Sequence, residues 1–141
     1  MKYHFSIHID SDGLWAQCIE LPECKTQGDS WEVLKAACYE ALHVFLEEPA
    51  ESRVVFPLPD ESLDGAPDTL SVAVDPEVAL AVLLRFYRTN SHLTQKQAAT
   101  LLGMKNVYSY QRLEKKSNPT LSLITKLPKV FPNFPLDYLF S

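Results

Sequence analysis

Residues 93–103 read Leu-Thr-Gln-Lys-Gln-Ala-Ala-Thr-Leu-Leu-Gly, and this stretch predicts a short capped helix followed by a tight turn. The spacing of Thr94 and Gln97 is that of a capping box. In this motif the threonine hydroxyl accepts the amide three residues on, and the glutamine side chain returns to the cap amide. The alanine and leucine residues that follow give the helix one apolar face, and Gly103 permits the turn.

A second helix is expected over residues 106–115, with Tyr110 and Leu113 facing inward. A third helix follows, for which Asn118 is the expected cap and Pro119 the first residue. A capped helix, a glycine turn and a second helix with a polar outer face form the arrangement that places a helix in the major groove of DNA. Residues 94–126 are therefore predicted to be a helix-turn-helix that binds DNA. An ordinary helical hairpin with a solvated polar face is the alternative.

Two kinds of DNA contact are expected from this segment. Gln95 and Lys96, at the start of the first helix, suit contacts to phosphate. Gln111 and Arg112 are of the kinds that read base edges, since amides suit adenine and arginine suits guanine. The expected DNA-binding residues are Thr94, Gln95, Lys96, Lys105, Asn106, Tyr108, Ser109, Gln111, Arg112, Lys115 and Lys116.

Charge is distributed unevenly along the 141 residues, whose net charge is -5. Residues 1–76 include four basic and 15 acidic side chains, a net charge of -11. The remaining residues include nine basic and three acidic side chains, a net charge of +6. This asymmetry predicts two modules with different partners, of which the basic one suits a polyanion.

The N-terminal part is predicted to be a small antiparallel sheet covered on one side by a helix. Apolar residues alternate with polar ones over residues 3–9, the period of a strand with one buried face. Asp12-Gly13 predicts a turn, and residues 14–19 and 24–27 predict two further strands. After a helix, a loop is expected over residues 50–68, with an optional short strand at 54–56, and a last strand over residues 70–74. The order is β-β-β-α-β.

The helix of this part is expected to begin at Asp29 or Ser30 and to end near Glu48, before Pro49. Apolar residues recur on one of its faces at spacings of three and four. This predicted buried face consists of Trp31, Leu34, Cys38, Leu42 and Phe45.

A further helix is expected over residues 77–89, after Pro76. It is apolar nearly all round, so we expect it to be buried, either under the helices that follow or against a second subunit. Residues 1–75 and 76–141 are thus the two predicted domains, and the fold class is α+β with an all-α second domain.

Composition excludes several classes of protein. No apolar run approaches the roughly 20 residues of a membrane-spanning helix, and no signal-peptide pattern begins the chain, so we expect a cytoplasmic protein. Cys18, Cys24 and Cys38 show no metal-ligand spacing and are expected to be reduced and buried. Because no catalytic triad order, P-loop or dinucleotide motif appears, we expect a binding protein, not an enzyme, with no cofactor and no metal.

Two polar groups in the N-terminal part are candidate sites. His4 and His8 are about 13 Å apart along one strand, too far to share an ion, and are expected on an exposed face that contacts a partner. A resemblance of the N-terminal part to a truncated RNase H fold would imply Asp10, Asp12 and Glu20 as candidate ligands of a metal-dependent nuclease, but no fourth carboxylate follows them at a suitable position.

Residues 93–121 resemble the XRE, or phage-repressor-like, helix-turn-helix family. The matching motifs are Leu93-Thr94-Gln95, Ala98-Ala99, Leu102-Gly103, Arg112-Leu113-Glu114 and Asn118-Pro119-Thr120-Leu121. The interval from Gly103 to Glu114 is one residue longer than the family's common pattern, so the resemblance defines the base-contacting positions to within one residue.

The N-terminal part resembles the HicB antitoxin family, which has a truncated RNase H-like fold. The resemblance rests on the alternating strand, on Glu20-Leu21-Pro22-Glu23-Cys24 and Gln27-Gly28-Asp29-Ser30, and on Ala41-Leu42 in the helix. Family members usually have glycine where Glu23 stands, so the turn there is expected to differ. The order of the two resemblances matches the HicB subgroup with a C-terminal helix-turn-helix.

The resemblance implies an antitoxin of a type II toxin–antitoxin pair. Its N-terminal domain would cover a HicA-type toxin, a small basic ribonuclease that cleaves mRNA, and its C-terminal domain would repress their operon by binding operator DNA. The net charge of -11 suits a basic partner. Repressors of this type act as dimers, which implies a homodimer or a higher even oligomer. The alternatives are a stand-alone regulator with a small-molecule-sensing N-terminal domain, and a metal-dependent nuclease tethered to DNA.

Overall fold

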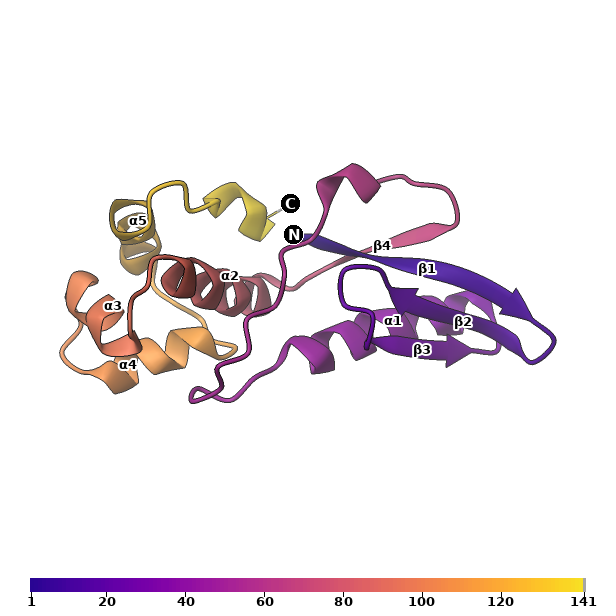
Figure 1. Cartoon of the computed structure of the whole chain (residues 1–141), viewed down its shortest axis with the longest axis horizontal. Helices are drawn as coiled ribbons and strands as arrows, with labels where there is room; N and C mark the ends of the chain where they lie inside the picture. The colour runs from indigo at the N-terminus through magenta and orange to yellow at the C-terminus, as the bar shows by residue number, and fades with distance from the viewer. Residues whose placement is uncertain (141) are drawn as a thin grey trace. The chain divides into compact units, whose positions relative to one another are not determined.

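The four strands expected in the N-terminal part form one antiparallel sheet in the order β3-β2-β1-β4 (Figure 1). The strands are β1 (Lys2–Asp10), β2 (Gly13–Cys18), β3 (Lys25–Gly28) and β4 (Thr69–Ala73). The computed structural model describes residues 1–140 and shows an α+β chain with this sheet and five α-helices among them. The chain divides into two units.

Unit 1 consists of Met1–Leu46 and Pro57–Val74, and unit 2 consists of Glu47–Phe56 and the chain from Asp75 onward. The predicted domain boundary at residue 75 therefore differs from the structure for the segment Glu47–Phe56, which we call the strap. Its main chain is bound by Arg85, whose guanidinium donates to the carbonyl oxygens of Ser52 at 2.5 Å and Pro49 at 3.3 Å. The optional strand at residues 54–56 does not form.

A tight turn joins β1 and β2, in which Asp10 pairs with Gly13. Gly13 has a φ of +128°, a backbone conformation that favours glycine. The turn residues are therefore Ser11 and Asp12, one position earlier than the predicted Asp12-Gly13 turn.

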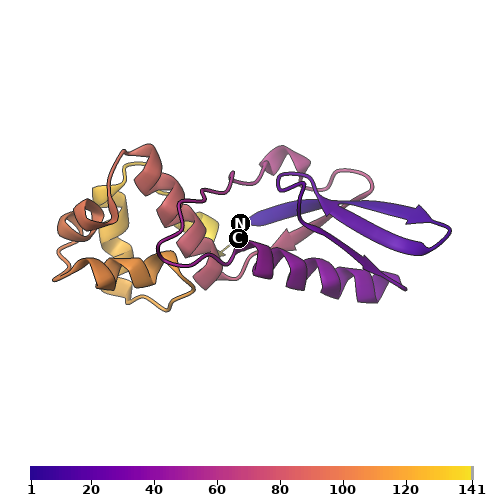
Figure 2. The same ribbon diagram turned by 60° about the horizontal axis from the view of Figure 1, so that its bottom comes forward.

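Helix α1 (Trp31–Leu46) covers one face of the sheet (Figure 2). Its buried residues are Leu34, Cys38, Leu42 and Leu46. Trp31, which was expected among them, is 43% exposed because it begins the first turn of the helix. Gly28 lets β3 approach α1 closely, since a Cβ atom there would lie 2.7 Å from the backbone nitrogen of Leu34.

Burial along β1 follows the predicted alternation only in its first half. Tyr3 and Phe5 are fully buried, but Ile9, next to the turn, is 80% exposed. His4, which was expected on an exposed face, is fully buried, because the segment containing the 3-10 helix η1 (Glu61–Leu63) lies over the face opposite α1 (Figure 2). This end of the sheet is therefore covered on both faces.

Unit 2 is built around α2 (Pro76–Asn90), which buries eight consecutive residues from Val78 to Arg85. The apolar surface of α2 is therefore buried within a single chain, whereas a second subunit was one of the two expected ways to bury it. The other helices of this unit are α3 (Gln95–Leu101), α4 (Val107–Gln111), η2 (Arg112–Glu114), α5 (Leu121–Val130) and η3 (Leu136–Phe140).

The start of α5 lies two residues later than predicted. Thr120 is its cap, and the threonine side chain accepts the amide of Leu123 at 3.2 Å, so Asn118 and Pro119 precede the helix. Among residues 1–140, none of the helices combines the length and the apolar character needed to cross a membrane.

Candidate nucleic-acid interface

The first helix of the candidate interface begins as the capping box predicted. Thr94 accepts the amide of Gln97 through its hydroxyl at 3.1 Å, and the Gln97 side chain accepts the Thr94 amide at 2.8 Å. Ala98 and Ala99 are buried, and α3 packs against α4. Small side chains at these positions allow that close packing.

The turn between the two helices depends on Gly103, whose φ is +72°. The side chain of Asn106 then caps α4 by accepting the amide and the hydroxyl of Ser109 at 3.0 and 3.2 Å. Tyr110 and Leu113 are buried, as predicted. The predicted second helix thus exists as α4 and its 3-10 continuation η2.

The outer surface of this region is strongly cationic. Glu114 is the only acidic residue between positions 94 and 136, and it is buried. Seven basic residues occupy the same interval, all of them exposed, so no exposed acid offsets their field. They are Lys96, Lys105, Arg112, Lys115, Lys116, Lys126 and Lys129.

The predicted DNA-binding residues that are not basic fall into three groups. Tyr108 is 68% exposed on α4, and Lys105 and Arg112, on either side of it in the sequence, are also exposed, so Tyr108 can contact a ligand directly. Thr94 and Asn106 are exposed, but their side chains act as helix caps. Ser109, Gln95 and Gln111 are half-buried.

Gln95 and Gln111 belong to a hydrogen-bond network inside unit 2. The Nε2 of Gln111 donates to the Oε1 of Gln95 at 3.1 Å. The Nε2 of Gln95 donates to the carbonyl oxygen of Ala50 at 2.8 Å and to Glu114 at 3.2 Å. The expected phosphate-contacting amide of Gln95 is thus already bonded within the protein.

Glu114 is the centre of this network. Its carboxylate accepts two hydrogen bonds from Arg88, at 2.6 and 3.0 Å, and lies 3.9 Å from Arg85. The side chain of Glu114 is fully buried, and that of Arg85 is 4% exposed. Buried charges are tolerated when they are paired and hydrogen-bonded, as these are.

The same cluster shifts the ionisation of its neighbours. Burial would lower the pKa of Arg88, but the hydrogen bonds to Glu114 raise it above its ordinary value. Burial, with the Glu114 carboxylate, raises the pKa of the Tyr110 phenol. Arg88 therefore stays charged and the Tyr110 phenol stays neutral at neutral pH. The sequence does not reveal the roles of Arg85 and Arg88 in this cluster, because Pro49, Ser52 and Glu114 lie 26 to 36 residues away from them.

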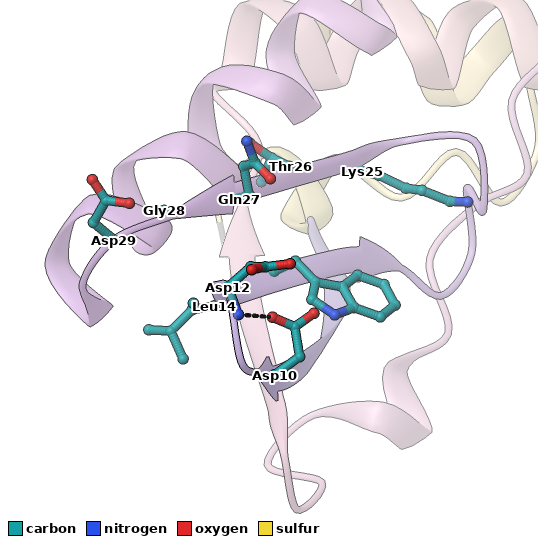
Figure 3. Close-up of a pocket in the computed structure, with 10 residues that line it drawn as sticks. Asp10, Asp12, Leu14, Lys25, Thr26, Gln27, Gly28 and Asp29 are labelled. Atoms are coloured by element: carbon teal, nitrogen blue, oxygen red, sulfur yellow. Dashed lines mark hydrogen bonds between the residues drawn. The ribbon is translucent and has the colours of Figure 1, made fainter.

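Unit 1 carries a different surface, an open groove of about 720 Å³ where β3 meets the β1–β2 turn (Figure 3). Asp10 and Asp12 lie on one side of it, and Figure 3 shows Lys25 and Asp29 at opposite ends of β3. Trp15 lines the groove and stacks on His8, with ring centres 4.0 Å apart. Unit 1 has 11 acidic and three basic residues, and unit 2 has seven and ten.

The three candidate ligands of a nuclease site are not brought together. Asp10 lies at the turn, whereas Glu20 bonds His4 near the other end of β1, which is about 20 Å away along the strand. No group of three histidine, cysteine or acidic side chains within residues 1–140 is placed to bind a metal ion. The three cysteines are buried and unpaired, and burial raises the pKa of Cys18 to about 12 and of Cys38 to about 11.

No protein-family model matches this chain, and no curated protein matches its sequence.

Proposed function

We propose that this chain binds DNA through α3 and α4, which form a helix-turn-helix of the XRE type. The observation that carries the proposal is the pair of capped helices joined at Gly103, with a surface that combines seven exposed basic residues and no exposed acid between positions 94 and 136. Such a surface attracts the phosphate backbone, and the exposed side chains of Tyr108 on α4 and Arg112 on its continuation η2 can enter the major groove.

We propose further that the protein is an antitoxin of the HicB type, whose unit 1 neutralises a small basic, mRNA-cleaving toxin. Three observations support this role: the β-β-β-α-β order, the excess of acidic residues in unit 1, and the groove lined by Asp10, Asp12 and Asp29. An acidic surface favours association with a basic protein by electrostatic complementarity. The operator would be that of the genes for the pair, bound by a homodimer or a higher even oligomer.

A DNA-binding experiment tests the first proposal. Duplexes are selected from a random pool by the full-length protein, and their affinities are compared with those of scrambled duplexes at several salt concentrations. Arg112→Ala is expected to cost about 1–3 kcal/mol on the selected duplex and to relax its sequence preference. Lys96→Ala should weaken binding to all duplexes alike and lower the salt slope by about one unit. If Arg112→Ala leaves both affinities unchanged, α4 is not the reading helix.

The antitoxin role is tested by co-expression with the neighbouring reading frame, expected to encode a basic protein of roughly 60–90 residues by the family resemblance. Copurification of the two proteins, and rescue of cell growth from the basic protein alone, are the expected results. Absence of both would refute the antitoxin role and leave the DNA-binding proposal standing.

A small-molecule sensor is the second candidate from the sequence. Ligand pockets for small molecules are mostly enclosed and apolar. The groove of unit 1 is open, and besides Leu14 and Trp15 its lining side chains are polar or charged, which suits a protein surface better.

A further inference from the structure

Strand β3 forms one edge of the sheet of unit 1, and within residues 1–140 it pairs only with β2 (Figure 1). In an antiparallel strand, the backbone groups of successive residues point to opposite sides. The amide of Cys18 donates to the carbonyl oxygen of Cys24 at 2.9 Å, so alternate residues from Cys24 to Gly28 face β2. The backbone amide and carbonyl groups of Lys25 and Gln27 therefore point away from the sheet, where another strand can bind them.

An apolar groove lies beside this edge. It has a volume of about 440 Å³ and separates β3 from α1, whose Ala37, Ala41 and Val44 line it. Val44 is 72% exposed, and Val33, one turn before Ala37 on the same side of the helix, is 52% exposed. A short strand with a lysine can serve only to protect an edge from pairing. The apolar side of α1 favours an occupant instead, because its burial next to a paired edge is stabilising.

The charges along β3 are arranged so that the strand complements itself. Lys25 and Asp29 lie at its opposite ends (Figure 3), so in an antiparallel pair centred on Gln27 each lysine lies opposite an aspartate. Opposite charges across two strands stabilise the pairing, and like charges oppose it. Centring the pair on Lys25 would set two lysines against each other, and centring it on Thr26 would set Glu23 near Asp29. The charge pattern therefore selects one register of self-pairing.

We propose that β3 pairs with β3 of a second copy of this chain, antiparallel and centred on Gln27, and that the same dimer covers the groove beside α1. The interface is isologous, so each favourable contact occurs twice. Main-chain hydrogen bonds provide the affinity of such a strand addition, and Lys25 and Asp29 fix its register. This inference goes beyond the DNA-binding and antitoxin proposals and depends on neither.

Cysteine crosslinking of the full-length protein tests the register. In Gln27→Cys the two introduced residues face each other with Cα atoms about 5.5 Å apart, a separation that suits a disulfide. We expect this variant to form a covalent dimer in a glutathione buffer, seen by nonreducing electrophoresis. Lys25→Cys is the matched control, because its two copies would lie about 14 Å apart and should not crosslink. Equal crosslinking of both variants would overturn the register, and crosslinking of neither would overturn the pairing.

Sedimentation equilibrium of the full-length protein measures the self-association itself. Gln27→Pro removes an outward amide, a change that edge strands tolerate, and should halve the mass of the largest oligomer without changing the circular dichroism. Lys25→Glu and Asp29→Lys should each weaken association on the order of tenfold. The double variant should regain it, since opposite charges again face each other. A double variant as weak as the single ones would refute the pairing of Lys25 with Asp29.

The groove and the alternative occupant are tested with the same measurement. Val44→Lys should weaken association, whereas Ala36→Lys, at an exposed position of α1 outside the groove, should behave as wild type. Equal effects of the two variants would exclude the groove from the interface. If Gln27→Pro keeps the wild-type mass but no longer copurifies with the basic neighbour, the edge binds the toxin, and self-pairing is refuted. A wild-type protein that stays monomeric at all concentrations refutes it as well, whatever its affinity for DNA.

Discussion

His4 is a polar residue whose environment is set entirely by distant parts of the chain. Its Nδ1 lies 2.6 Å from Glu20, and its Nε2 lies 2.5 Å from Asp64. Glu20 also accepts the backbone amides of His4 and Asp60, at 2.9 and 3.1 Å. The alternating pattern of β1 correctly places His4 on the face opposite Tyr3 and Phe5, but the burial of His4 depends on partners 16 and 60 residues away. No local pattern contains that information.

Stability should depend on pH through this cluster. Burial lowers the pKa of His4, but hydrogen bonds to Glu20 and Asp64 raise it to a net value above the ordinary 6.5. The stabilisation from protonated His4 is therefore complete below about pH 6.5 and is lost as pH rises through the raised pKa. His4→Gln should cost about 1–3 kcal/mol at low pH and less at high pH, measured by urea unfolding.

The control for this prediction is His92→Asn. His92 is exposed and has a φ of +58°, which asparagine tolerates. Its substitution should leave the pH dependence of the unfolding free energy as in the wild type. A His4→Gln variant with unaltered pH dependence would show that His4 is not protonated in the folded protein.

A substitution at Gly103 should strain the backbone without creating a steric clash. Its φ is +72°, and an added Cβ would meet nothing within 4 Å. Gly103→Ala should therefore cost about 1 kcal/mol, and Gly103→Asn less, as measured by thermal unfolding. Gly28→Ala should cost more, because its Cβ would lie 2.7 Å from the Leu34 nitrogen. Equal costs for the two alanine variants would contradict this explanation.

Among the helices and strands, the sequence predicted an element best where the interactions that define it span only a few residues. The capping box of Thr94 and Gln97 placed α3 correctly, since both groups act within one turn. The cap of α5 was misplaced because Asn118 and Thr120 both suit that role, and only the bond to Leu123 distinguishes them. The exposed basic residues between positions 94 and 116 follow from the sequence, but the internal bonds of Gln95 do not, because they depend on the strap.

The packing of α2 against η2 depends on the charge pair at its centre. Glu114→Ala would leave Arg85 and Arg88 buried without their carboxylate. We expect a loss of about 3–5 kcal/mol in the unfolding free energy, measured in urea by circular dichroism. Asp137→Ala, an exposed acid in η3, is the matched control and should change stability by less than about 0.5 kcal/mol. A mild effect at Glu114 would show that solvent reaches the pair.

In the whole molecule, neither of the two units is one continuous stretch of the chain. The residue sequence suggested one boundary near residue 75, with net charges of -11 and +6 around it. The structure assigns the strap, with its three acidic residues and Arg53, to unit 2. The charges of the units become -8 and +3, so the contrast remains but is smaller. Which unit the strap joins depends on Arg85, 33 residues beyond Ser52, and loop composition does not reveal it.

This arrangement predicts an asymmetry between fragments of unit 2. A chain beginning at Asp75 lacks the strap, so Arg85 loses its carbonyl partners at Pro49 and Ser52 and Gln95 loses Ala50. We expect its unfolding free energy to be about 2–5 kcal/mol lower than that of the same chain with residues 47–56 fused ahead of Asp75. A glycine-serine linker of about 15 residues gives the fused strap a reach of roughly 20 Å.

Urea unfolding followed by far-UV circular dichroism measures both fragments, and a second fusion with Ala50→Arg controls for added length. Because that variant keeps the linker but cannot seat the strap, it should be no more stable than the fragment that starts at Asp75. Equal stability of all three would mean that solvent satisfies Arg85 as well as the strap does.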